Sequence, residues 1–124
     1  MLVRDDDMKN ILLIDDDHDV RKVIGMALTE DGFAVTGARD GAEALGMLDK
    51  QSPDLLILDL VMPNMNGFEF MRKVRQSWPD LPIIVLSGHI EKETEQIIED
   101  LGGNHFIRKP LEFDALRQII DSVS

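Results

Sequence analysis

Short apolar runs alternate with amphipathic segments five times along this chain of 124 residues. A run such as residues 55–58 is apolar at consecutive positions, which is typical of a strand buried on both faces of a parallel sheet. The intervening segments repeat apolar residues at helical spacing, as helices packed on a sheet do. The alternation predicts an α/β fold: a doubly wound, five-stranded parallel sheet with five helices, joined by right-handed crossovers.

The ends of several elements are indicated by local signals. Asp19 is expected to be the N-cap of the first helix, with Asp17 in the solvated loop before it. Gly32 is placed to stop that helix in a left-handed cap. Asp40 and Glu43 resemble a capping box at the start of the second helix. The expected buried stripe of the first helix consists of Val20, Val23, Ile24, Ala27 and Leu28.

Composition excludes several classes of protein. The net charge of −11 argues against nucleic-acid binding, which needs a basic face. No apolar run approaches the roughly 20 residues of a membrane helix, and the absence of cysteine excludes disulfides and thiolate metal sites. We therefore expect a cytoplasmic protein without direct membrane contact. It should consist of a flexible leader, residues 1–8, and one domain over residues 9–124.

Four of the five expected strands carry candidate site residues at their carboxyl ends. Asp15 and Asp16 follow the first strand, and Asp59 ends the third. Ser87 ends the fourth strand and Lys109 the fifth. Ligands of such sheets bind beyond the carboxyl ends of the strands. If these four strands are neighbours, three carboxylates, a hydroxyl and an ammonium group meet at one rim.

This set of groups suggests phosphoryl chemistry. Clustered carboxylates favour a hard cation, and oxygen ligands suit Mg²⁺. A hydroxyl and an ammonium group opposite the metal would bind the other oxygens of a phosphoryl group. One carboxylate would then be the nucleophile. We assign this role to Asp59, because it lies on the central strand between the metal pair and the pair Ser87 and Lys109.

These residues stand in stretches that resemble the receiver domain of two-component response regulators, of the chemotaxis-regulator type. The resemblance covers residues 9–123, and its matching stretches are "LLIDDD" at 12–17, "LLILDLVMPNMNG" at 55–67, "IIVLSG" at 83–88 and "FIRKP" at 106–110. It implies a flavodoxin-like fold with strand order 2-1-3-4-5.

The resemblance also implies a role for each site residue. Asp59 would accept a phosphoryl group from a histidine kinase, a phosphotransfer protein or a small acyl phosphate. Asp15, Asp16, Asp59 and the backbone carbonyl of Val61 would hold Mg²⁺, with Mn²⁺ as an alternative. Ser87 and Lys109 would bind the phosphoryl group and Phe106 would be the aromatic switch, whereas Pro63, Gly67 and Pro110 would shape the loops.

The implied function is a phosphorylation-activated signalling switch, which phosphorylates itself from a donor and slowly dephosphorylates, rather than a turnover enzyme. Its output would be an unknown downstream protein, a fused output domain or a phosphorylation-dependent homodimer. The main alternative is a receiver module excised from a larger DNA-binding regulator or a hybrid histidine kinase.

Three other classes fit the sequence less well. A Mg²⁺-dependent phosphatase with an Asp nucleophile would need Thr where Asp19 stands. A flavodoxin-like flavin binder would need a first loop that holds phosphate, which three aspartates would repel. A calcium loop beginning at Asp15 would need Gly where Val20 stands.

Overall fold

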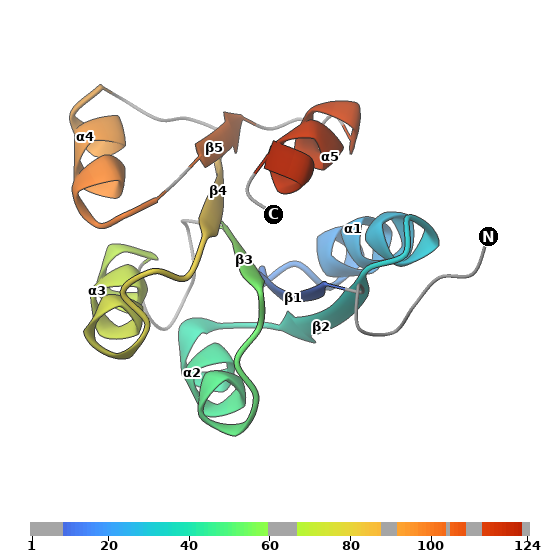
Figure 1. The fold of residues 1–124 in the computed structure, drawn as a ribbon, viewed down its shortest axis with the longest axis horizontal. Coiled ribbons are helices and arrows are strands. Elements are labelled where there is room, and N and C mark those ends of the chain that lie inside the picture. Colours follow the sequence, from blue (N-terminus) through green and yellow to red (C-terminus); the bar gives the residue numbers. More distant parts are fainter. Residues whose placement is uncertain (1–8, 60–66, 88–91, 104, 109–112, 123–124) are drawn as a thin grey trace.

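The computed structural model describes residues 9–59, 67–87, 92–103, 105–108 and 113–122. Within these ranges strands and helices alternate as predicted (Figure 1). The strands are β1 (Asn10–Ile14), β2 (Ala34–Ala38), β3 (Leu55–Asp59), β4 (Ile83–Ser87) and β5 (His105–Arg108). The helices are α1 (His18–Glu30), α2 (Gly41–Lys50), α3 (Gly67–Ser77), α4 (Lys92–Asp100) and α5 (Phe113–Ser122). None of these helices is long and apolar enough to cross a membrane.

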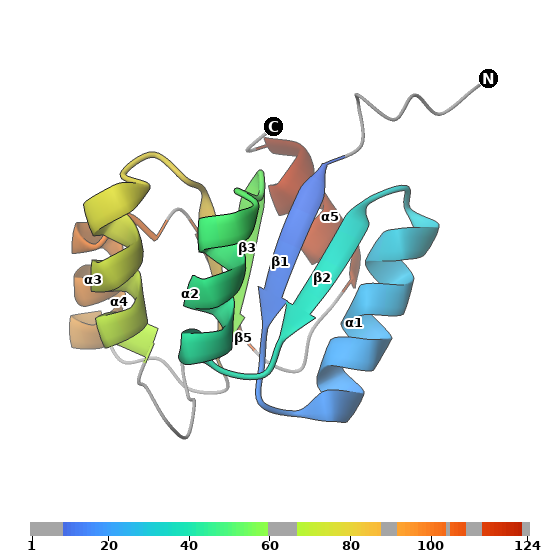
Figure 2. The ribbon, with the colours of Figure 1, turned by 90° about the horizontal axis from the view of Figure 1, so that it is seen from below.

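The five strands form one parallel sheet in the order β2-β1-β3-β4-β5. The order confirms the predicted fold class, and the arrows of β1 and β2 point to the same end of the sheet (Figure 2). Ile14 pairs with Leu58, and Asp59 pairs with Leu86. The carboxyl ends of β1, β3 and β4 therefore meet at one rim, whereas β2 lies at an edge of the sheet.

Helices cover both faces of the sheet, with α1 and α5 on one face and α2, α3 and α4 on the other (Figure 1). The central strand β3 is buried along its whole length. Leu56 and Leu58 pack with the helices α2, α3 and α4, and Leu55 and Ile57 pack with α1 and α5. A consecutive apolar run suits this position, because successive side chains of a strand point to opposite faces.

The prediction for the start of α1 is wrong in detail. Asp17, not Asp19, is the N-cap: its backbone is extended, and its side chain accepts hydrogen bonds from the backbone N–H groups of Asp19 and Val20. Asp19 lies inside the first turn, where a carboxylate is favoured by the helix dipole. At the other end of α1, Gly32 has a φ of +97°, which confirms the left-handed cap.

The buried stripe of α1 is narrower than predicted. Ile24 and Leu28 are buried, but Val23 is 55% exposed. The helix lies beside β1 and β2 near one edge of the sheet, so only a narrow stripe of it faces the core. The capping box of α2 is half formed: Asp40 accepts from the Glu43 N–H at 2.8 Å, but the Glu43 carboxylate accepts from the N–H of Arg39.

Candidate functional site

Three carboxylates converge at the carboxyl ends of β1 and β3. One carboxylate oxygen each of Asp15, Asp16 and Asp59 lies within 4.8 Å of the other two. Among the residues that the structure describes, no other three acidic or histidine side chains come together in this way. Asp15 and Asp59 are buried, and Asp16 is exposed. Carboxylates this close repel one another, and a divalent cation would offset the repulsion.

The positions of the first two aspartates follow from how the chain leaves β1. The Asp15 N–H donates to the carbonyl of Ala38 at 3.1 Å, which continues the pairing between β1 and β2. The Asp15 carboxylate accepts from the Asp17 N–H at 2.9 Å. Asp17 then caps α1, so the loop between strand and helix is only three residues long. This short connection keeps Asp15 and Asp16 beside the end of β3.

One contact of this loop has no signal in the sequence. The Arg21 guanidinium donates from Nη1 to the backbone carbonyl of Asp15 at 2.6 Å. Arginine near the start of a helix is usually a solvated surface residue, and neither periodicity nor spacing indicated that it would turn back to the loop.

The other predicted site residues are described in part. Phe106, in β5, is half-buried and packs against the core on the face of α2, α3 and α4. Gly67 is buried at the start of α3. Ser87 is the last residue of β4 and follows Leu86, which pairs with Asp59. The structure does not describe the Ser87 side chain or the leader at residues 1–8. Four further predicted site residues also lie outside the described residues: Val61, Pro63, Lys109 and Pro110.

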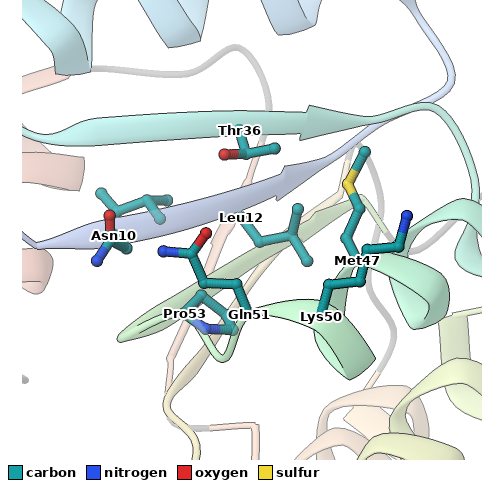
Figure 3. Close-up of a pocket in the computed structure, with 8 residues that line it drawn as sticks. Asn10, Leu12, Thr36, Met47, Lys50, Gln51 and Pro53 are labelled. Carbon is teal, nitrogen blue, oxygen red and sulfur yellow. The ribbon is translucent and has the colours of Figure 1, made fainter.

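A pocket of about 220 Å³ lies elsewhere, between β1, β2 and the end of α2 (Figure 3). The residues that line it include Asn10, the first residue of β1, and Thr36, Lys50 and Gln51. None of the three clustered aspartates lines it. The pocket is therefore separate from the acidic site.

The fold and the acidic rim together define a class of protein. The family model of the response regulator receiver domain matches residues 11–121, and this chain belongs to that family. It is thus a receiver domain, the signalling module of two-component systems.

Particular relatives are similar over most of the chain. The transcriptional regulatory protein GlrR of Escherichia coli (strain K12) is 36% identical over 112 residues, which are 90% of this chain and 25% of that protein. The response regulator MprA of Mycobacterium tuberculosis (strain ATCC 25177 / H37Ra) is 37% identical over 106 residues, which are 86% of this chain and 46% of that protein. The chain therefore spans between a quarter and a half of these curated relatives.

A solved structure matches over almost its whole length. The chemotaxis protein CheY4 of Vibrio cholerae has a TM-score of 0.90 and 31% identity, with 94% of this chain and 99% of that chain covered. The fold of the chain is therefore the flavodoxin-like fold of such receivers.

Proposed function

We propose that this receiver domain, residues 9–124, is phosphorylated on Asp59 in a Mg²⁺-dependent reaction. The observation that carries the proposal is the approach of the three carboxylates to within 4.8 Å at the carboxyl ends of β1 and β3. An all-oxygen, strongly anionic set of donors fits a hard divalent cation, so Mg²⁺ is the expected metal and Mn²⁺ the alternative. Asp15, Asp16, Asp59 and the backbone carbonyl of Val61 would hold it.

Each residue of the site then has a part in phosphoryl transfer. An Asp59 carboxylate oxygen forms a bond to phosphorus, while the bond between phosphorus and the donor breaks and the donor leaves with its electron pair. Bound Mg²⁺ would neutralise charge on the phosphoryl oxygens. The hydroxyl of Ser87 and the ammonium of Lys109 would bind the same oxygens.

The added charge would be the signal. A phosphoryl group brings about −1.5 to −2 charges at pH 7 and new acceptor oxygens. We expect Ser87 to move toward it and Phe106 to turn inward, with a change of the surface formed by α4, β5 and α5. Pro63, Gly67 and Pro110 would shape the loops around the site. Slow hydrolysis of the acyl phosphate would reset the switch, so that the domain is not a turnover enzyme.

The partners follow from the same proposal. The donor would be a histidine kinase or a phosphotransfer protein in the cytoplasm, without nucleic acid or a membrane in contact with this domain. The partial coverage of GlrR and MprA favours a module fused to an output domain, whereas the full coverage of CheY4 favours a stand-alone receiver that binds a downstream protein. A phosphorylation-dependent homodimer is a third form of output.

Intact mass spectrometry after incubation with acetyl phosphate and Mg²⁺ tests the proposal. The wild type should gain one phosphoryl group, and Asp59→Asn should gain none. Asp49→Asn is the matched control, because Asp49 is an exposed aspartate in the last turn of α2, which leads to the start of β3, whereas the acidic rim lies at the carboxyl end of β3. A wild type that stays unmodified, or an Asp59→Asn variant that is modified as fast as Asp49→Asn, would overturn the proposal. Multiple turnover of a phosphomonoester would favour the phosphatase class instead.

A further inference from the structure

Arg21 reaches from α1 back to the loop that carries the acidic cluster. Its Nη1 lies 2.6 Å from the carbonyl oxygen of Asp15, and the side chain is half-buried. A guanidinium donor makes this hydrogen bond charge-assisted and stronger than a neutral one. We propose that Arg21 is a positioning residue of the metal site, which sets the orientation of Asp16. This inference deepens the proposed function and rests on it.

The link from Arg21 to Asp16 is a single peptide group. The carbonyl of Asp15 and the N–H of Asp16 belong to one planar peptide group, whose C–N bond resists rotation. Fixing the Asp15 oxygen therefore fixes the direction in which the chain enters Asp16. The Asp16 carboxylate is exposed, so the backbone rather than surrounding side chains has to determine where it lies.

Two other hydrogen bonds hold Asp15 in place. The Asp15 N–H donates to Ala38, and its carboxylate accepts from the Asp17 N–H. With the bond from Arg21, the backbone donor, the backbone acceptor and the side chain of Asp15 are all engaged. Of these three contacts, only the hydrogen bond from Arg21 is made to the peptide group that joins Asp15 to Asp16.

Gly37 provides the path for the Arg21 side chain. A Cβ atom at Gly37 would lie 3.5 Å from Cδ and 3.8 Å from Nε of Arg21. Gly37 pairs with Leu13 near the end of β1, so the arginine passes over the sheet edge next to the loop that it contacts. A branched side chain at position 37 would compete with this path without altering any charge.

The charge of Arg21 and its positioning contact predict opposite effects on cation binding when the arginine is replaced by a neutral residue. By Coulomb attraction alone, removing a positive charge beside three carboxylates should strengthen cation binding. Loss of a positioning contact should weaken it. Lys22 is the next residue of α1, is exposed and carries the same charge, so Lys22→Gln reproduces the change of charge without the contact to Asp15.

The experiment measures Mg²⁺ affinity by isothermal titration calorimetry, well below the unfolding temperature. Arg21→Gln should bind Mg²⁺ roughly three- to tenfold more weakly than wild type, the factor expected for one net hydrogen bond. Lys22→Gln should bind as tightly as wild type or slightly more tightly. Gly37→Val should weaken binding in the same direction as Arg21→Gln, and Arg21→Lys, which keeps a charged donor, should restore part of the affinity.

A second readout needs no metal. The Asp17 amide donates to the Asp15 carboxylate, so its hydrogen exchange should be faster in metal-free Arg21→Gln than in Lys22→Gln. An Arg21→Gln variant that binds Mg²⁺ as tightly as Lys22→Gln and protects the Asp17 amide equally well would overturn the positioning role alone. A wild type that binds no Mg²⁺ would refute the proposed function, and this inference with it.

Discussion

Gly102→Ala should destabilise the protein by displacing the guanidinium of Arg75. Arg75, on α3, donates to the carbonyl oxygens of Trp78 at 2.9 Å and Leu81 at 2.8 Å. It also donates to Leu101 at 2.9 Å and to Gly102. One side chain therefore joins the end of α3, the turn before β4 and the turn after α4. Burial lowers the pKa of the Arg75 guanidinium below its ordinary value.

The size of the effect can be worked from the geometry at Gly102. Its φ is +80°, and a Cβ there would lie 2.6 Å from the Arg75 Nε. The backbone conformation costs about 1–2 kcal/mol for a residue other than glycine. If the guanidinium moves away, the bonds to Leu101 and Gly102 are lost, at about 0.5–1.5 kcal/mol net each. The free energy of unfolding should therefore fall by about 2–5 kcal/mol in total.

A double-mutant cycle separates the two contributions. Once Arg75→Ala has removed the guanidinium, Gly102→Ala should cost only the backbone share of about 1–2 kcal/mol. The coupling energy should thus be about 1–3 kcal/mol, because two hydrogen bonds are counted once instead of twice. Urea unfolding followed by circular dichroism gives the four free energies.

Arg72 provides the control for this cycle. It is an exposed arginine on the same helix, so Arg72→Ala and Gly102→Ala should be additive. Additivity within about 0.5 kcal/mol in the Arg75 cycle itself would refute the reasoning, since it would mean that the two positions do not share the contact.

Three further predictions concern α1 and the acidic rim. Asp17→Ala should lower the free energy of unfolding by about 1 kcal/mol through loss of the N-cap, and a larger loss in Asp19→Ala would contradict the assignment. Saturating Mg²⁺ at about 100 times its Kd should stabilise the wild type by about 2.7 kcal/mol, and Asp16→Asn should lose most of this gain in thermal unfolding. Ile24→Ala should cost about 2–5 kcal/mol in urea unfolding, whereas Val23→Gln should stay within about 0.5 kcal/mol, and equal costs would contradict the observed burial.

The sheet and the acidic cluster could be predicted because they depend on signals local in the sequence. Apolar runs such as residues 55–58 determine strands, and the polar residues that end them must meet at one rim of a parallel sheet. The sequence therefore predicts that Asp16 and Asp59 lie together.

Features that depend on tertiary geometry could not be predicted in this way. Asp17 and Asp19 have the same capping propensity, and the choice between them depends on how sharply the chain turns after β1. The exposure of Val23 depends on the position of α1 near the edge of the sheet. The contacts of Arg21 and Arg75 end on backbone carbonyls, which every residue carries, so no sequence pattern marks them.

The burial of β3 has a mechanical consequence. This strand is hydrogen-bonded to β1 on one side and β4 on the other, and all five of its residues are buried, with Asp59 at its end still 6% exposed. Asp59 is thus attached to a buried strand that is held by a neighbouring strand on each side. A group added to its carboxylate cannot be accommodated by displacement of its own strand, so any rearrangement has to be absorbed by the side chains and peripheral segments that surround it.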